Sequence, residues 1–136
     1  MIIVVDSDAL IGSLYSQDQH FKTSKQIRVK LAKLNARLIY PATVLVETVT
    51  FLQGRLNKRG LADKVINLII SQEIDIEQVD GEILIKANTF MNLRGSKHNT
   101  FFDAVVAAIA QKYKADAIFS FDKFYKGKGF KLASEL

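Results

Sequence analysis

Two short, largely apolar segments, each directly followed by an aspartate, indicate the fold class of this chain. Residues 2–5 (Ile-Ile-Val-Val) precede Asp6, and residues 117–121 (Ala-Ile-Phe-Ser-Phe) precede Asp122. Short apolar runs rich in β-branched or aromatic residues are typical of buried strands in parallel sheets, which helices cover on both faces. The two segments therefore predict an α/β fold with one such strand near each end of the chain.

Between these segments the hydrophobic pattern alternates between helices and strands. Apolar residues at helical spacing predict helices over about residues 8–17, 22–36, 61–72, 81–94 and 101–114, together with one that starts at Pro41 and ends near Asn57. Strands are expected at residues 38–40 and 74–79, with 130–132 as a candidate edge strand. This alternation predicts an α/β fold with a mainly parallel sheet of four to five strands flanked by helices. Since no repeat or linker divides the chain, residues 1–136 are expected to form one domain.

Composition removes several classes of protein. A chain without cysteine has neither a disulfide framework nor a cysteine-ligated zinc site. Its longest uncharged stretches, such as residues 9–17, are nine residues long, about half of what a membrane-spanning helix needs. The first residues lack the basic region of a signal peptide and reach an acid at Asp6. We therefore expect a cytoplasmic protein that does not enter a membrane.

The formal net charge of +5 conceals a strong separation of charges along the chain. Residues 19–46 contain no acid but six lysines and arginines, and residues 55–64 contain four lysines and arginines and one acid. A third basic run, of six lysines, lies in residues 112–131. Residues 73–82, by contrast, contain five acids and no base. A solvated surface would explain any one of these runs. Three basic runs in a small domain favour a polyanionic partner, because phosphate contacts release counterions and steer association.

Two further acids interrupt segments that are otherwise apolar. Glu47 is the only charged residue in positions 39–53, and Asp103 is the only one in positions 100–110. Charged residues are rare in buried helices unless they are paired, so Glu47 is difficult to explain as a structural residue. Asp103 has a structural explanation, because the helix dipole favours a carboxylate in the first turn.

The expected topology brings four acids to one edge of the sheet. Asp6 and Asp122 follow the carboxyl ends of parallel strands, where α/β proteins bind ligands, although aspartate also commonly starts a turn there. Glu47 lies early in a helix that leaves such an end, and Asp103 opens a helix that must start near it. Carboxylates about 5 Å apart repel by roughly 3 kcal/mol per pair at an effective dielectric constant near 20. They must be protonated, spread apart or neutralised by a cation, and all-oxygen ligands suit Mg²⁺ or Mn²⁺.

Four segments, taken in order along the chain, resemble those of PIN-domain ribonucleases. They are Ile-Ile-Val-Val-Asp-Ser-Asp-Ala-Leu-Ile from residue 2, Pro-Ala-Thr-Val-Leu-Val-Glu from residue 41, Phe-Phe-Asp-Ala-Val-Val-Ala-Ala-Ile-Ala from residue 101, and Ile-Phe-Ser-Phe-Asp-Lys-Phe from residue 118. The chain length and the order of the segments are similar to those of VapC-type toxins of toxin–antitoxin pairs. The resemblance implies a PIN-like fold over essentially the whole chain.

Residue by residue, the resemblance places the family's catalytic, metal-binding acids at Asp6, Glu47, Asp103 and Asp122. Ser120 matches a small hydroxyl residue that is frequent near the fourth acid. Asp8 stands where serine, threonine or asparagine is more usual, so it is an additional ligand, a supporting group or a helix-capping acid. Of these three roles we favour the cap.

The activity that the resemblance implies is metal-dependent endonucleolytic cleavage of RNA. One or two Mg²⁺ or Mn²⁺ ions would activate a water for attack on phosphorus and leave a 5′-phosphate product. A small antitoxin protein that blocks the acidic site, and a homodimer, are the implied partners. We further expect five basic residues to guide the RNA backbone into the site: Lys22, Lys25, Arg28, Lys123 and Lys126.

Aromatic residues and histidines receive simpler interpretations. Three aromatic residues are candidates for exposed rings that stack on RNA: Tyr15, Phe124 and Tyr125. The other phenylalanines near the motifs are expected in the core: Phe51, Phe90, Phe101, Phe102, Phe119 and Phe121. His20 and His98 lie in polar sequence surroundings and are interpreted as surface groups.

Three alternatives to a toxin stay open. A housekeeping RNA-processing nuclease of the same fold would carry the same motifs. The segment Val-Asp-Ser-Asp from residue 5 also resembles the D-x-D motif of haloacid-dehalogenase-like phosphatases, although Leu10 stands where that family has threonine. A non-catalytic nucleic-acid-binding module would explain the basic runs but not four isolated acids.

Overall fold

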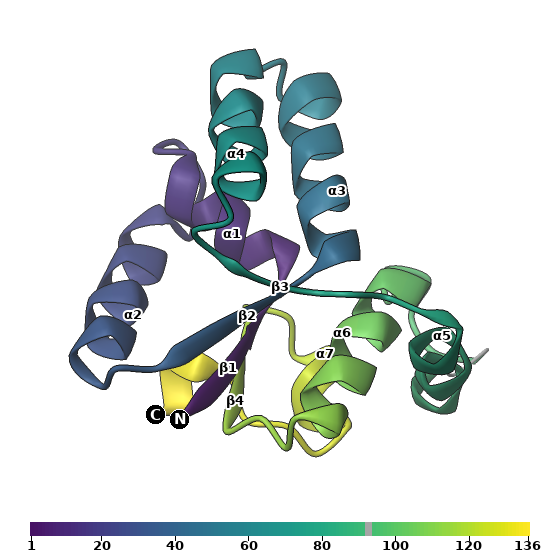
Figure 1. Cartoon of the computed structure of the whole chain (residues 1–136). Helices are drawn as coiled ribbons and strands as arrows, with labels where there is room; N and C mark the ends of the chain where they lie inside the picture. Colours follow the sequence, from purple (N-terminus) through teal and green to yellow (C-terminus); the bar gives the residue numbers. More distant parts are fainter. Residues whose placement is uncertain (92–93) are drawn as a thin grey trace.

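A four-stranded parallel sheet forms the centre of the computed structural model, which describes residues 1–91 and 94–136 (Figure 1). Within these residues the strand order is β3-β2-β1-β4. The strands are β1 (Ile2–Val5), β2 (Arg37–Pro41), β3 (Asp75–Glu77) and β4 (Ala117–Phe119). The two segments that end at aspartates are the adjacent strands β1 and β4, so the predicted α/β class with a parallel sheet is confirmed.

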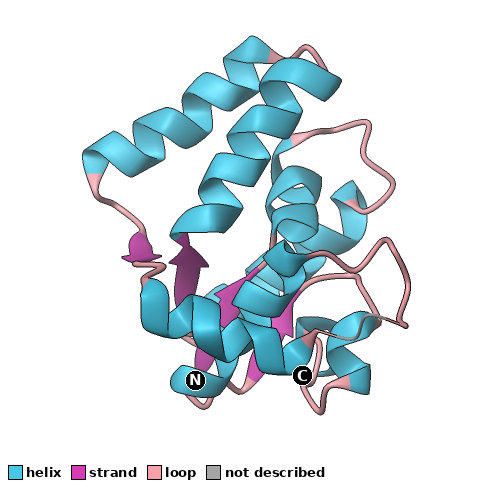
Figure 2. Ribbon diagram, turned by 90° about the vertical axis from the view of Figure 1, so that its right-hand side faces the viewer, coloured by secondary structure: helices cyan, strands magenta, loops and turns pink. Residues whose placement is uncertain are grey.

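Helices surround the strands in the described part of the chain (Figure 2). The helices are α1 (Ser7–Leu14), α2 (Phe21–Lys33), α3 (Ala42–Thr50), α4 (Arg59–Ser71), α5 (Gly81–Ala87), α6 (Phe101–Lys112) and α7 (Phe124–Gly127). Helix α6 packs on β1 and α5 packs on α6, while α1 packs against α2. Helices α3 and α4 lie side by side and extend beyond the sheet (Figure 1). A π-helical turn (Phe51–Arg55) extends α3, and short 3₁₀ turns occupy Asn88–Phe90 and Ala133–Glu135.

Several elements differ from their predicted bounds. The strand expected over 74–79 is limited to β3, and the candidate edge strand at 130–132 makes one parallel bridge, between Ile118 and Leu132. The helix expected over 81–94 ends as α5 and a 3₁₀ turn, and its predicted residues 92–93 lie outside the described residues. Pro41 ends β2 rather than opening α3, because its backbone is extended, with ψ of 136°.

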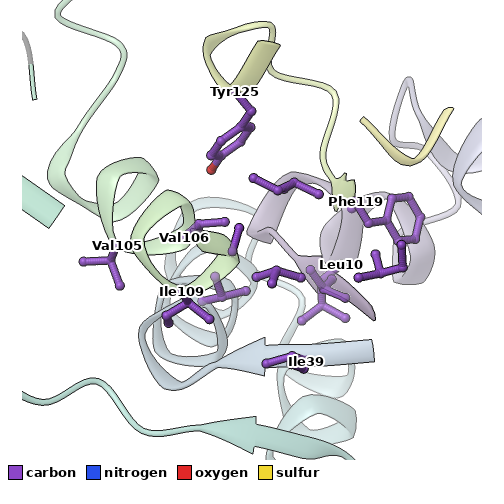
Figure 3. Packing of buried hydrophobic residues seen from close by; sticks show 14 of the residues in the cluster. Leu10, Ile39, Val105, Val106, Ile109, Phe119 and Tyr125 are labelled. Atoms are coloured by element: carbon purple, nitrogen blue, oxygen red, sulfur yellow. The ribbon is translucent and has the colours of Figure 1, made fainter. Parts of the chain in front are cut away.

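Helix α6 supplies much of the core. Residues 104–110 are all buried, and Val105, Val106 and Ile109 pack in one cluster with Ile39 and Phe119 (Figure 3). A helix that is apolar on every side is stable only when neighbours cover it completely. Asp103 therefore stands one residue before a wholly buried segment, and that segment fixes its position.

Two acids of the run at residues 73–82 form ion pairs at the edge of the sheet. Asp75 of β3 accepts from Arg37 Nε of β2 at 2.7 Å, and the Lys112 Nζ of α6 lies 3.3 Å from Glu77 Oε1. The cationic groups of Arg37 and Lys112 each lie 5.4 Å from the centre of the Tyr113 ring. Part of the run therefore holds the edge strand to its neighbours.

No helix among the described residues is long and apolar enough to cross a membrane.

Candidate active site

Asp6 is the most deeply buried of the four acids and is 4% exposed. It follows β1 and forms the N-cap of α1, where its Oδ1 accepts from the Ser7 backbone N–H at 2.7 Å. Its Oδ2 accepts from the Tyr125 hydroxyl at 2.7 Å and lies 3.1 Å from Ser120 Oγ. Burial raises the pKa of Asp6, and these hydrogen bonds oppose that effect.

Asp103 lies close to Asp6 at the start of α6. Its Oδ2 accepts from the Thr100 backbone N–H at 2.9 Å, which completes a capping box, and its Oδ1 lies 3.5 Å from the Tyr125 hydroxyl. The same hydroxyl thus stands between the two carboxylates. Burial raises the pKa of Asp103 to about 7, the charge of Asp6 adds to the rise, and the hydrogen bond from Thr100 opposes it.

Asp122 joins the end of β4 to the start of α6. Its Oδ2 accepts from Asn99 Nδ2 at 3.1 Å, and its Oδ1 accepts from the Phe124 backbone N–H at 2.9 Å. The second bond starts the short helix α7. The charge of Asp122 also raises the pKa of Asp6 and of Asp103, so it lies within electrostatic reach of both.

Glu47 reaches the same place from α3. Burial raises its pKa, a hydrogen bond from the Ser7 side chain opposes the rise, and the charge of Asp6 adds to it. The charge of Glu47 also raises the pKa of Asp103. The charges of Asp6, Glu47 and Asp122 therefore all act on Asp103. The four acids named from the sequence lie near one edge of the sheet, directly after β1, in α3, in α6 and in the segment after β4.

Asp8 does not cap the helix, so the interpretation we favoured from the sequence is wrong. Asp6 occupies the N-cap, and Asp8 lies in the first turn with its side chain turned toward the end of β4. Its Oδ2 accepts from the Phe121 backbone N–H at 2.8 Å and lies 3.0 Å from Ser120 Oγ. Burial raises the pKa of Asp8 to about 7, and the charge of Asp6 adds to the rise. Its Oδ1 is buried and has no hydrogen-bond partner among the described residues.

Ser120 links three of the acids. Its side chain is 1% exposed, and its Oγ lies within hydrogen-bond distance of Asp6 and Asp8 while accepting from the Asp122 backbone N–H at 3.1 Å. A hydroxyl carries one proton, so Ser120 donates to Asp6 or to Asp8 at any moment, not to both. The predicted hydroxyl residue near the fourth acid therefore lies inside the cluster.

Tyr125 was missed by the sequence analysis and lies at the centre of the site. It was expected as an exposed ring, but it is completely buried and hydrogen-bonds to Asp6. No local pattern in the sequence indicates this role, because the hydroxyl's partners, Asp6 and Asp103, are 119 and 22 positions away. Phe124 and Tyr15, the other stacking candidates, are half-buried.

Two phenylalanines and one histidine also differ from expectation. Phe101 and Phe102 are 41% and 43% exposed, because they precede the buried part of α6. His20 is half-buried rather than a free surface group, since its ring stacks on Phe121 with 3.9 Å between ring centres and 6° between planes. This stack places the start of α2 beside the acids.

The five basic residues do not all lie at the site. Lys123 directly follows Asp122 and is exposed, and Lys22 is exposed near the start of α2. Lys25 and Arg28 instead line a separate groove of about 530 Å³ beside β2. Lys126 Nζ lies 3.0 Å from Glu135 Oε1, so its charge is already paired.

The donor atoms of these acids suit a hard divalent cation. The side chains of the cluster offer oxygen donors, which Mg²⁺ and Mn²⁺ prefer. Within residues 1–91 and 94–136, no three His, Asp or Glu side chains already form a ready-made metal-binding group. Several carboxylate oxygens instead accept hydrogen bonds from Ser7, Thr100 and Asn99. An ionised carboxylate has about four acceptor positions, so one or two such bonds leave lone pairs for a cation.

Comparison with known proteins gives consistent matches over nearly the whole chain. A family model described as PIN domain matches residues 3–131. The VapC ribonuclease of Aquifex aeolicus (strain VF5) is 24% identical over 129 residues, which cover 94% of this chain and 93% of that protein.

Two solved structures share the fold. VapC20 (Rv2549c) of Mycobacterium tuberculosis, described as a Sarcin-Ricin loop cleaving toxin, superposes with a TM-score of 0.79 at 21% identity, covering 94% of this chain and 95% of the other. VapBC2 from Rickettsia felis, bound to a DNA fragment from its promoter, gives a TM-score of 0.63 at 14% identity, covering 96% and 93%.

Proposed function

This chain belongs to the PIN domain family, and on that basis we propose that it is a metal-dependent endoribonuclease, the toxin of a type II VapBC-type toxin–antitoxin pair. The observation that carries the proposal is the gathering of Asp6, Glu47, Asp103 and Asp122 from four separate parts of the fold at one sheet edge. The likeness to a VapC ribonuclease over 94% of the chain supports the same conclusion. The family match also favours a nuclease over a haloacid-dehalogenase-like phosphatase.

These four acids are proposed to hold one or two Mg²⁺ or Mn²⁺ ions and to act as the catalytic residues. When bound, such an ion promotes ionisation of a water and stabilises negative charge on phosphate oxygens. Protein groups position the acids: Thr100 holds Asp103, Asn99 holds Asp122, and Ser120 lies between Asp6 and Asp8. Asp8 is proposed as a supporting group, because its Oδ2 is already committed to Phe121 and Ser120.

RNA is proposed to approach over the basic residues nearest the acids, Lys123 and Lys22. Both are exposed, and His20 places the α2 end that carries Lys22 beside Phe121. Lysine contacts to phosphates bind RNA of any sequence and weaken as salt rises. These residues would thus supply affinity for the backbone, and the acids would supply cleavage.

A small antitoxin and a second copy of the chain are the proposed partners. Support for the homodimer comes from an exposed apolar surface next to Glu47, formed by Val46, Phe51 and Phe102. Val46 is 65% exposed there. Contiguous apolar surface beside a polar site is typical of a protein–protein contact. We also propose that residues 1–136 form one domain that acts in the cytoplasm.

Expression of the chain in bacteria tests the proposal against the housekeeping alternative. A toxin arrests growth and leaves cellular RNA fragments with 5′-phosphate ends, and co-expression of a small reading frame immediately upstream in the same operon relieves the arrest. A housekeeping nuclease would cleave RNA in vitro but cause no arrest. Absence of both arrest and cleavage would refute the nuclease itself.

A further inference from the structure

The hydroxyl of Tyr125 is placed where the packing of the core does not require one. The ring is completely buried, lies edge-on to Phe124 with 5.2 Å between ring centres, and joins the apolar cluster that includes Phe119 (Figure 3). A phenylalanine would fill nearly the same volume. Burying a hydroxyl costs free energy unless it finds a partner, so its retention here depends on the groups that it contacts.

Those groups are two proposed metal-site carboxylates. The hydroxyl donates to Asp6 Oδ2 at 2.7 Å and lies 3.5 Å from Asp103 Oδ1. The first distance is that of a strong hydrogen bond to a carboxylate, and the second is at the limit of one. Since the other oxygen of Asp6 accepts from Ser7 N–H, both ends of this carboxylate are held.

The ring itself is held in place by another acid of the site. Asp122 Oδ1 accepts from the Phe124 backbone N–H and thereby starts α7, the four-residue helix that carries Tyr125. The α7 backbone is closed by the Tyr125 carbonyl, which accepts from the backbone N–H groups of Lys128 and Phe130 at 3.0 Å. The Tyr125 hydroxyl therefore contacts Asp6 and Asp103, and the helix that carries it starts beside Asp122.

We propose that Tyr125 is a positioning residue for the metal site, an inference that rests on the proposed function. Its hydroxyl prevents the Asp6 carboxylate from rotating and keeps it facing Asp103, so that both acids present lone pairs to one divalent ion. Tyr125 is not itself a ligand and does not touch the RNA. Groups that hydrogen-bond to metal ligands commonly contribute about 10- to 100-fold in metal affinity or activity.

The test is Tyr125→Phe in the full chain, compared with the wild type by Mn²⁺ titration and by steady-state RNA cleavage. We expect Mn²⁺ to bind about 10- to 100-fold more weakly. At a fixed, subsaturating Mn²⁺ concentration kcat falls while KM for RNA is unchanged, and excess Mn²⁺ restores most of kcat. Tyr113→Phe is the matched control, because that hydroxyl pairs with Glu77 away from the acids, and its Mn²⁺ affinity should equal that of the wild type.

Terbium luminescence gives a second readout that needs no variant at the site. The chain has four tyrosines and no tryptophan, so Tb³⁺ emission excited through tyrosine requires a tyrosine beside the bound ion. The wild type and Tyr113→Phe should both show Tb³⁺ emission, and added Mn²⁺ should displace Tb³⁺ and reduce that emission. Wild-type binding of Tb³⁺ without emission would contradict the proposed place of Tyr125.

The outcomes separate this inference from the proposed function. If Tyr125→Phe binds Mn²⁺ and cleaves RNA like the wild type, Tyr125 is a core residue only and the inference is wrong. If the wild type neither binds Mn²⁺ nor cleaves RNA, the proposed function fails first. Weaker Mn²⁺ binding by Tyr125→Phe, with an unchanged KM for RNA and an unaffected Tyr113→Phe control, is the result that the inference expects.

Discussion

The carboxylate of Asp8 accepts a hydrogen bond from the backbone N–H of Phe121 at 2.8 Å. This contact ties the first turn of α1 to the segment after β4, which carries Asp122. It joins residues that are 113 positions apart in the sequence. Asp8 thereby stabilises the junction at which the acids meet.

Removing this acceptor should therefore destabilise the protein. Asp8→Ala leaves the Phe121 N–H without its partner, and losing such a half-buried bond costs about 1–3 kcal/mol of the free energy of unfolding. Asp8→Asn retains an oxygen acceptor and, like Asp8→Ala, removes the charge that Asp6 repels, so it should be more stable than Asp8→Ala by about that amount. Urea unfolding at pH 7 measures both variants. Equal stability of the two would show that the hydrogen bond to Phe121 is unimportant.

The stability of the metal-free protein should fall as the pH rises. The pKa values of Asp8 and Asp103 are raised to about 7 in the fold, from an ordinary value of 3.8. Between these values the folded chain binds more protons than the unfolded chain, so the free energy of unfolding decreases with pH and levels off above pH 7. We expect a loss of about 1–3 kcal/mol between pH 5 and pH 8, allowing for solvent screening of the half-exposed Asp103.

Thermal unfolding in EDTA at several pH values measures this effect. Asp103→Asn should reduce the pH dependence and raise the Tm of the metal-free protein at pH 8, since it removes a charge that the other acids repel. The amide oxygen can still accept from the Thr100 N–H. A Tm that rises from pH 5 to pH 8 in EDTA would contradict the electrostatic account of the site.

Two neighbouring lysines should contribute unequally to RNA binding. Lys123 is exposed beside Asp122, whereas Lys126 lies 3.0 Å from Glu135. In an Asp103→Asn background that prevents cleavage, Lys123→Ala should reduce the magnitude of the slope of log K against log salt by about one phosphate contact. Lys126→Ala is the matched control and should change the slope less. Fluorescence anisotropy with labelled RNA gives both slopes, and the reverse order would contradict the proposed path.

The apolar surface next to Glu47 should mediate the proposed homodimer. Val46 is 65% exposed and lines, with Phe51, Phe102 and Arg55, a groove of about 440 Å³. Val46→Arg buries a cation in such a contact and should convert the dimer to a monomer, as measured by light scattering after size exclusion. Ile85→Arg, at a site 76% exposed on α5, should leave the dimer intact. A Val46→Arg variant that stays dimeric would place the interface elsewhere.

Local patterns were sufficient to predict the central strands and the part of the fold in which the four acids lie. Residues 2–5 and 117–119 are β-branched or apolar throughout and form the adjacent strands β1 and β4. Glu47 was identifiable because it is isolated in an apolar helix, which a solvated charge would not be. These inferences need only the neighbours along the chain and the rule that parallel strands share their carboxyl ends.

Other features depended on contacts that no local pattern contains. Tyr125 is buried because Asp122 starts a four-residue helix that turns its side chain back under Asp6. The role of Asp8 depends on Phe121, which is remote in the sequence. Hydrophobicity alone could not distinguish exposed Phe102 from the buried residues that follow it, because the difference depends on which part of α6 its neighbours cover.

Cleavage of RNA by the purified full chain is the most direct test of the central claim, that these acids form a metal-dependent nuclease site. The substrates are structured RNAs, incubated with Mg²⁺, with Mn²⁺ or with EDTA, and the variants are the wild type and Asp103→Asn. We expect cleavage to 5′-phosphate ends by the wild type with either metal, none in EDTA, and a loss of about 10³-fold or more for a variant that lacks a catalytic carboxylate. Cleavage that persists in EDTA or in Asp103→Asn, or no cleavage of any RNA by the wild type with either ion, would contradict the account.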